Sequence, residues 1–338
     1  MAVVGILTAG GDCPGLNAVI RATTARVVAG GGRVVGFRDG WAGAMEDHVI
    51  PLDRDAVRGI LGRGGTILGT SRTDPYVHGR GLASLTPTLR KHEVDVLVVV
   101  GGDGTLRSSA RLADEGLAVV GVPKTIDNDI PGTDVTFGFH TAVQIATDAI
   151  DRLTTTAEAH NRVMLVEVMG RSQGWIAHYS GLASGADVIL IPELPMPLEE
   201  AAGIITRRHA AGHNYSIVVV AEGISPPDAH ELPKDAFGFD RLGGVAYDVA
   251  PVLERLTGFE TRVTVLGHLQ RGGTPTAFDR VLATRLGTAA ADAALAGTRG
   301  IMVAVRGTTI DTVPLTEAGG PIRGVDPALY EVARTFFG

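Results

Sequence analysis

Short runs of apolar and β-branched residues recur along the chain and alternate with stretches that have helical periodicity. The runs lie at residues 3–7, 34–37, 94–100, 117–122, 163–168, 188–191, 217–221, 263–266 and 301–305. Runs that are apolar on both faces suit parallel strands covered by helices on either side. The pattern therefore predicts βαβ units, an α/β fold, and ligands that collect beyond the carboxyl ends of the strands.

Three other segments have patterns of their own. Residues 141–153 place Ala142, Ala146, Ala149, Ile150 and Leu153 on one stripe, which predicts an amphipathic helix that links two lobes. Residues 223–244 are rich in Pro, Gly, Asp and His, which predicts a surface excursion. Residues 308–326 are weakly patterned and predict no definite element.

The size and composition of the chain fit a soluble globular protein. With 338 residues, 45% of them apolar, the chain has material for two domains with buried cores. A helix that spans a bilayer needs about 20 consecutive apolar residues, and no run approaches that length. Residues 2–7 also lack the basic flank of a signal peptide. We therefore expect a cytoplasmic protein with no membrane partner.

Charge and cysteine content argue against two further classes. The formal net charge is −7, from 37 acidic and 30 basic residues, which disfavours a general nucleic-acid surface. A polyanionic ligand must then be met by local arginines. The single cysteine, Cys13, can form neither an intramolecular disulfide nor a zinc cluster, so we expect no redox chemistry.

A glycine-rich loop, TAGGDCPGLN at residues 8–17, follows the first predicted strand and opens a helix. The backbone N–H groups of such a loop and the helix N-terminus can converge on a phosphate. A tight strand-to-helix turn explains the glycines equally well, because a lone Gly-rich turn is weak evidence.

Two later loops add carboxylates. The sequence GGDGT at 101–105 places Asp103, a possible Mg²⁺ ligand, in a second glycine cradle, although a simple turn is the alternative. In TIDND at 125–129, an extended backbone would aim Asp127 and Asp129 to one side, so that one of them could act as a base. The simpler interpretation is an Asx-turn with solvated acids. Together the loops indicate a phosphoryl-transfer site.

These motifs, with VMGR at 168–171 and TRVTVLGHLQRGG at 261–273, resemble 6-phosphofructokinase over residues 5 to about 298. The resemblance is to the bacterial family, in its mixed-substrate, actinobacterial-like group. It implies an α/β fold of two similar three-layer αβα lobes with mostly parallel sheets. Residues 1–139 and 270–318 would form the ATP- and Mg-binding lobe, and residues 140–269 and 319–338 the lobe that binds fructose 6-phosphate.

The family also implies a reaction and the roles of individual residues. ATP would phosphorylate the 1-hydroxyl of fructose 6-phosphate in glycolysis. Asp127 would accept the proton, with Thr125 beside it, and Asp103 would hold Mg²⁺. Arg72 and Arg171 would stabilise charge on the transferring phosphoryl group. The nucleotide phosphates would contact Gly11, Arg72, Thr73, Gly102, Asp103, Gly104 and Thr105.

The resemblance assigns the sugar phosphate to a second set of residues. These are Thr125, Ile126, Asp127, Asp129, Met169, Gly170, Arg171, Glu222, His268, Leu269, Gln270 and Arg271. Arg162 and Arg262 would reach the 6-phosphate from a neighbouring subunit, which implies a homodimer or homotetramer and an inactive monomer. Seen singly, Arg72 and Arg162 fit surface cations, His268 a core histidine, and Glu222 a solvated strand end.

Two positions bear on the phosphoryl donor. In this family, Asp after Gly-Gly-Asp with Lys after the next Pro is typical of pyrophosphate users, and Gly at both positions is typical of many bacterial ATP users. This chain is mixed, with Gly104 and Lys124. An Asp at 104 would clash with and repel the α-phosphate, whereas Gly leaves that space open, so the sequence favours ATP. Lys124 could help either donor or face solvent beside the Pro turn.

Two other functions stay open. One is a reversible, pyrophosphate-dependent 6-phosphofructokinase. The other is a non-catalytic sensor of nucleotides or sugar phosphates, which would be expected to lose the base or the arginines that this chain keeps.

Overall fold

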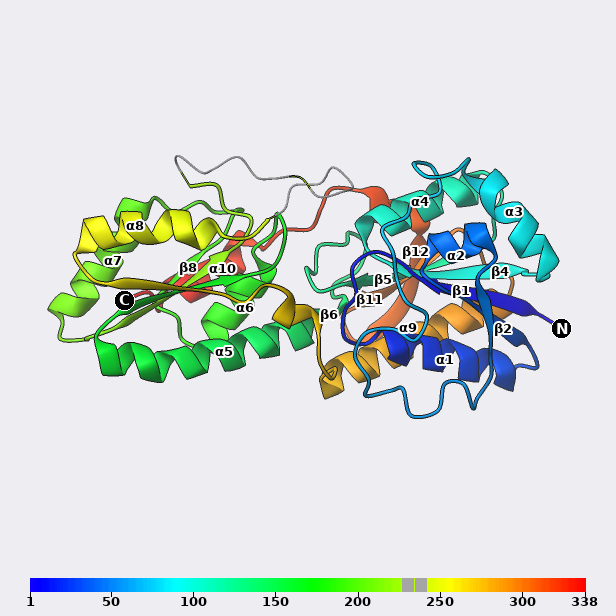
Figure 1. The fold of residues 1–338 in the computed structure, drawn as a ribbon, viewed down its shortest axis with the longest axis horizontal. Coiled ribbons are helices and arrows are strands. Elements are labelled where there is room, and N and C mark those ends of the chain that lie inside the picture. Colours follow the sequence, from blue (N-terminus) through cyan, green and yellow to red (C-terminus); the bar gives the residue numbers. More distant parts are fainter. Residues whose placement is uncertain (227–233, 235–241) are drawn as a thin grey trace. The chain divides into compact units, whose positions relative to one another are not determined.

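The computed structural model describes residues 1–226, 234 and 242–338, which form two compact units (Figure 1). Unit 1 comprises Met1–His140 and Arg271–Ile322, and unit 2 comprises Thr141–Gln270 and Arg323–Gly338. Most of the predicted excursion at 223–244 falls on residues 227–233 and 235–241, which lie outside the described residues.

An eight-stranded, mainly parallel sheet forms the centre of unit 1. Its strands run in the order β12 (Thr309–Pro314), β11 (Ile301–Arg306), β5 (Val119–Thr125), β4 (Val96–Gly101), β1 (Val3–Thr8), β2 (Arg33–Phe37) and β3 (Val49–Leu52), and the short β6 (Phe137–Gly138) pairs with β5. Only the edge strands β3 and β12 pair antiparallel to their neighbours in this sheet. An antiparallel edge on a parallel sheet is common in α/β folds.

Helices cover both faces of this sheet (Figure 1). One face carries α1 (Leu16–Ala29) and α9 (Ala277–Leu295), and the other carries α2 (Trp41–Glu46), α3 (Leu82–Lys91) and α4 (Asp103–Asp114), with the 3₁₀ helix η2 (Leu315–Gly319) against α4. The helices α1 and α9 approach closely at Gly287, where a Cβ would lie 2.7 Å from the carbonyl oxygen of Val19. A side chain at that position would force the two helices apart.

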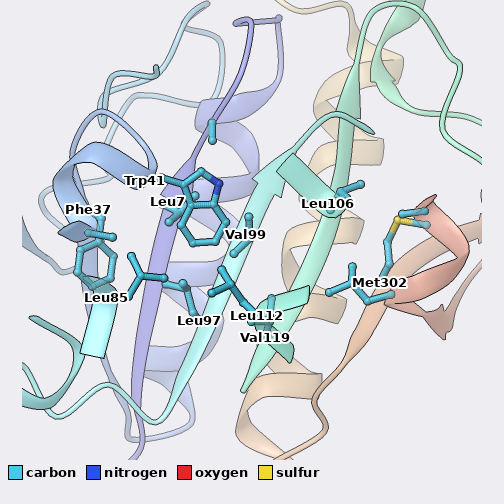
Figure 2. Close-up of a cluster of buried hydrophobic side chains, with 14 of the residues drawn as sticks. Leu7, Phe37, Trp41, Leu85, Leu97, Val99, Leu106, Leu112, Val119 and Met302 are labelled. Atoms are coloured by element: carbon cyan, nitrogen blue, oxygen red, sulfur yellow. The ribbon is translucent and has the colours of Figure 1, made fainter. Parts of the chain in front are cut away.

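The core of unit 1 lies between the sheet and α2, α3 and α4. Figure 2 shows Leu97 and Val99 of β4 among Trp41, Leu85 and Leu112, which come from the covering helices. All five side chains are buried, and each strand therefore contributes one of its apolar faces to this cluster.

Replacing Leu97 with alanine is expected to destabilise unit 1 by about 2–5 kcal/mol, because the side chain is fully buried and the neighbouring strand can collapse only partly into the cavity. A lower urea midpoint, followed by tryptophan fluorescence, measures the change. The matched control is Val77→Ala, which removes an apolar side chain that is 77% exposed. Equal midpoints for the two variants would contradict this description of the core.

Unit 2 contains a four-stranded parallel sheet in the order β10 (Thr261–Val265), β7 (Val163–Val168), β9 (Ser216–Ala221) and β8 (Val188–Leu190). One face is covered by α7 (Leu198–Ala210) and α8 (Val245–Thr257), which pack on Val188, Leu190, Val218 and Val220. The other face is covered by α5 (Phe139–His160) and α6 (Trp175–Ala183), and α10 (Pro327–Arg334) packs against α6.

The predicted fold class is confirmed, and all nine predicted strands are present. The structure adds β3, β6 and β12, so that the sheet of unit 1 is larger than that of unit 2. The predicted helix at 141–153 is part of the longer α5, in which Ala142, Ala146 and Ile150 are buried as the stripe requires. Among the described residues, no helix is both long and apolar enough to cross a bilayer.

Candidate active site

Three loops meet at the carboxyl edge of the sheet in unit 1. Strand β4 lies between β1 and β5, and all three run parallel. Their ends therefore carry the Gly10–Gly11 turn, the Gly102–Thr105 turn and Asp127 side by side. This is the edge at which parallel α/β sheets bind ligands.

The first loop is held by contacts to its backbone carbonyls. The Thr70 hydroxyl donates to the carbonyl of Gly10 at 2.6 Å, and Gly10 N–H donates to Ser71 O at 2.9 Å. These bonds fix the segment that carries Arg72 and Thr73 beside the first loop. Gly10 has a φ of 83°, which favours glycine, so the loop needs this residue for its conformation as well as for close approach of a ligand.

Lys124 completes the support of this loop from the neighbouring strand. Its side chain is buried, and Nζ donates to the carbonyl of Gly11 at 2.5 Å, while Arg271 Nη1 donates to the carbonyl of Asp12 at 3.2 Å. Burial lowers the pKa of Lys124, although nearby Cys13 and Asp127 oppose that change. The interpretation of Lys124 as a solvent-facing side chain is therefore wrong.

Cys13 lies in the same region and is inert in the folded protein. The side chain is fully buried, and burial raises the pKa of its thiol to about 12. A protonated, inaccessible thiol reacts poorly with electrophiles.

The second loop begins helix α4 and presents one carboxylate. Asp103 lies in the first turn, and its Oδ1 accepts a hydrogen bond from Arg107 Nε at 2.8 Å. No group of three or more His, Cys, Asp or Glu side chains among the described residues is arranged to hold a metal ion. A single partly exposed carboxylate still fits Mg²⁺, which commonly takes one or two protein carboxylates together with substrate phosphates and water.

Gly104, the next residue, faces open space. A Cβ added there meets no atom within 4 Å, and the residue is exposed. The protein itself therefore leaves this space free, and glycine is not required at 104 by packing. The backbone φ is not in the left-handed region either.

Helix α4 is tied to the segment that carries Arg72, through residues that the sequence analysis did not identify. The Ser108 hydroxyl bonds to Asp74, and the Tyr76 hydroxyl donates to Glu115 Oε1 at 2.8 Å. The Arg111 guanidinium lies 3.6 Å from the centroid of the Tyr76 ring. No motif marks these contacts, because they join residues 34 to 39 positions apart in the sequence.

Asp127 is a buried carboxylate with one oxygen that no group of the described residues satisfies. Thr125 Oγ1 accepts from Asp127 N–H at 3.0 Å and donates to Oδ2 at 3.2 Å. Oδ1 is buried and has no hydrogen-bond partner within the described residues. Asp129 and Asn128 are buried as well, so the interpretation of this loop as solvated acids does not fit. A buried carboxylate oxygen without a donor is suited to accept one from a ligand.

Unit 2 has a corresponding set of loops. Strand β7 lies between β10 and β9, and the three ends carry Met169–Arg171, Glu222 and the 3₁₀ helix η1 (Gly267–Arg271). Glu222 Oε1 accepts from the N–H groups of Gly170 at 3.2 Å and Arg171 at 2.9 Å. Glu222 is buried, so it is not a solvated strand end.

The remaining predicted residues of this loop set fall into two kinds. Gln270 is fully buried, accepts from Met169 N–H at 3.3 Å and donates to Gly267 O at 3.1 Å, so its side chain holds the loops together. Arg171, His268 and Leu269 are exposed. His268 is therefore not a core histidine.

Comparison with known proteins supports one family. The family model described as phosphofructokinase matches residues 3–294. A pyrophosphate–fructose 6-phosphate 1-phosphotransferase of Streptomyces coelicolor is 55% identical over 99% of both chains.

The chain belongs to the phosphofructokinase family. An ATP-dependent 6-phosphofructokinase 3 of Streptomyces coelicolor is 50% identical over 98% of both chains. Among solved structures, the T-state phosphofructokinase of Pichia pastoris matches 99% of this chain with a TM-score of 0.84 and 32% identity. This chain spans 36% of that longer one. The predictions of the family and of an enzyme of this family are confirmed.

Two arginines that this family resemblance assigned to the sugar phosphate lie at the opposite edge of the sheet in unit 2. Arg162 precedes β7, and Arg262 is the second residue of β10. Because a strand rises about 3.3 Å per residue, Arg162 is roughly 20 Å from the Gly170 loop along β7. Arg162 Nε pairs with Glu260 Oε2 at 2.9 Å, and Arg262 pairs with Glu260 as well. The pair with Arg162 lowers the pKa of Glu260.

The structure therefore gathers the predicted residues into three groups. Gly11, Arg72, Thr73, Gly102–Thr105, Lys124–Asp127, Asp129 and Arg271 belong to unit 1, and Met169–Arg171, Glu222 and His268–Gln270 belong to one edge of unit 2. Arg162 and Arg262 form the third group. Arg271, predicted to contact sugar phosphate, bonds to the backbone beside the first glycine-rich loop.

Proposed function

We propose that this protein transfers the γ-phosphoryl group of ATP to the 1-hydroxyl of fructose 6-phosphate. The observation that carries the proposal is the buried Oδ1 of Asp127, which has no hydrogen-bond partner in the described part of the chain and lies next to two glycine-rich turns at one sheet edge. Phosphoryl transfer needs a phosphate cradle, a cation and an acceptor for the hydroxyl proton. Unit 1 supplies residues for each.

The roles of the residues follow from this chemistry. Oδ1 of Asp127 accepts the proton of the attacking hydroxyl, while Thr125 holds the other oxygen in place. Mg²⁺, held by Asp103 and the donor phosphates, would neutralise charge on those phosphates. Arg72 and Arg171, both exposed, would stabilise the charge of the transferring group. The Met169–Arg171 loop, Glu222 and His268 would bind the sugar phosphate.

The choice of ATP rests on Gly104. The space beside its Cα is open, so the α-phosphate of a nucleotide meets neither a side chain nor a negative charge there. Pyrophosphate is the second candidate, because relatives named for both donors are about equally similar to this chain. A buried cation at Lys124 fits a donor of either kind.

One assay separates the two donors. Purified protein, fructose 6-phosphate and Mg²⁺ are combined with ATP or with pyrophosphate, and fructose 1,6-bisphosphate is measured by a coupled reaction. We expect turnover with ATP at a kcat/KM at least about tenfold above that with pyrophosphate. Activity with pyrophosphate alone would establish the second candidate, and binding of both substrates without turnover would indicate a sensor.

Lys124 offers a further prediction about the donor side. Lys124→Met removes the bond to the Gly11 carbonyl, so the KM for either donor is expected to rise about tenfold, or 1.4 kcal/mol, while the KM for fructose 6-phosphate stays constant. Lys91→Met, at an exposed lysine of the same unit, is the matched control. A loss confined to pyrophosphate would mean that Lys124 binds that donor directly and does not support the loop.

We also propose that Arg162 and Arg262 bind the 6-phosphate of the fructose 6-phosphate held in the active site of a neighbouring subunit. Their place at the far edge of the unit 2 sheet supports a role outside the site formed by the Met169–Arg171 loop of the same chain. A homodimer or homotetramer follows from this role. Mixing inactive Asp127→Asn with inactive Arg162→Ala chains should restore part of the activity, because hybrid oligomers contain intact sites.

A further inference from the structure

Arg171 has a backbone conformation that is unusual for its residue type. Its φ is 53°, in the left-handed region that residues with a Cβ rarely adopt. Such a conformation persists only where the surrounding structure enforces it. The contacts that hold residues 169–175, the loop between β7 and α6, therefore fix the backbone position and direction from which the Arg171 side chain extends.

The first half of this loop is held by the end of β9. Glu222 accepts the N–H groups of Gly170 and Arg171, as described above. The next residue, Gly223, approaches so closely that a Cβ there would overlap the carbonyl oxygen of Arg171. The turn is closed by a bond from Gln173 N–H to Gly170 O at 3.0 Å.

The second half is held by Glu193, a half-buried residue in the segment after β8. Both of its carboxylate oxygens lie 2.9 Å from Gly174 N. Oε1 also accepts from Val325 N–H at 2.9 Å. One carboxylate therefore joins the Arg171 loop to the C-terminal segment, although the three residues are far apart in the sequence.

A second contact joins the same two segments. The indole Nε1 of Trp175 donates to the carbonyl of Arg323 at 2.8 Å, and the Arg323 guanidinium lies 4.5 Å from the Trp175 ring centroid. Trp175 is buried, so its indole lies in the protein interior and the bond is partly buried.

Residues 323–338, which we call the C-terminal strap, are anchored in unit 2 beyond this point. The Tyr330 hydroxyl is buried and donates to Ile189 O at 2.6 Å, in the strand that precedes Glu193. Arg334 pairs with Glu200 at 2.9 Å. The strap is thus bonded to β8 and α7, the two elements that flank Glu193 in the sequence. It contacts the loop at 169–175 from this fixed position.

We propose that Glu193 and the C-terminal strap position Arg171 for phosphoryl transfer. Glu193 is a positioning residue, since its carboxylate contacts backbone N–H groups of the loop and strap. The activity readout rests on the proposed function, whereas the structural coupling does not. A displacement of about 1 Å in a reacting geometry can lower the rate about 10²-fold. Loss of the contacts made by Glu193 is therefore expected to lower kcat.

The test compares Glu193→Ala with Glu193→Gln. Alanine removes every bond to Gly174 and Val325, and kcat is expected to fall about 10- to 100-fold with the KM for ATP unchanged. Glutamine keeps an amide oxygen for both N–H groups and is expected to retain kcat within about threefold. Glu199→Ala, at an exposed acid in the first turn of α7, is the matched control and should retain full activity.

A double-mutant cycle decides whether the effect passes through Arg171. In an Arg171→Ala background, Glu193→Ala is expected to lower kcat by less than about twofold, because the group that it positions is already absent. An equal loss in both backgrounds would overturn the proposal and leave Glu193 a structural residue only. Trp175→Phe, which keeps the ring and removes the N–H donor, applies the same cycle should Glu193→Ala fail to fold.

Amide hydrogen exchange gives a readout that does not depend on activity. Glu193→Ala should speed exchange at Gly170, Arg171 and Gly174, and Glu199→Ala should leave it unchanged. Unchanged exchange in Glu193→Ala overturns the coupling. Absence of phosphoryl transfer in the wild-type protein would instead refute the proposed function, with the exchange result still valid.

Discussion

Replacing Asp127 with asparagine is expected to lower kcat by about 10²–10⁴-fold, while donor affinity stays within about threefold. Asparagine has the same shape and keeps a carbonyl oxygen for Thr125, but it accepts a proton far less readily than a carboxylate. Steady-state kinetics with fructose 6-phosphate, together with calorimetric titration of the donor, measures the two quantities separately.

The fold should tolerate this substitution. Oδ1 of Asp127 has no hydrogen-bond partner among the described residues, so removal of its charge leaves no protein donor unsatisfied. We expect a thermal midpoint equal to or above that of the wild type. Asp114→Asn, at an exposed acid at the end of α4, is the matched control. A variant that keeps full turnover would eliminate Asp127 as the proton acceptor.

Gly104→Asp is expected to reduce kcat/KM for ATP by about 10²–10³-fold, or about 3–4 kcal/mol, because a carboxylate that faces a phosphate of the same charge is repelled by it. Kinetics with pyrophosphate should change much less, since that donor has no α-phosphate. The ratio of kcat/KM values for the two donors, measured in wild type and variant, is the decisive quantity.

Gly104→Ala provides the matched control for this prediction. A methyl group at 104 meets open space, so activity with ATP should persist, and alanine in the first turn of α4 should add up to about 1 kcal/mol of helix stability. If alanine and aspartate reduce the use of ATP equally, steric blocking and not charge governs the position. If neither changes it, the α-phosphate does not occupy this space.

The sheet cores could be predicted because their signal is local. Residues 96–100 in β4 and 217–221 in β9 are apolar on both faces, which requires a central strand covered by helices on both sides. The strands that were missed are short or lie at edges. In β12, for example, most residues are exposed, and the strand forms only because β11 offers a partner. A strand that depends on its neighbour in this way has no clear hydrophobic pattern in its own sequence.

In the candidate site too, local features could be predicted from the sequence and contacts between distant segments could not. The motifs located the glycine-rich turns, Asp103 and Asp127, because each needs a specific residue type at the end of a strand. Other contacts join segments that are remote in sequence, and no motif indicates them. They are the bond from Lys124 to Gly11 O, the bond from Tyr76 to Glu115, and the bond from Val325 N–H to Glu193. The bond from Arg271 to Asp12 O is likewise a contact that no motif indicates, and the assignment of Arg271 to the sugar phosphate stays a prediction.

The buried thiol of Cys13 has a practical consequence for solution studies. Since the chain contains no other cysteine and this one is fully enclosed, maleimide reagents should leave the native protein unmodified. A cysteine introduced at exposed Val332 on α10 would then carry the only dye. The wild-type sequence thus serves directly as a background for fluorescence or spin-label reporters, without prior removal of a native thiol.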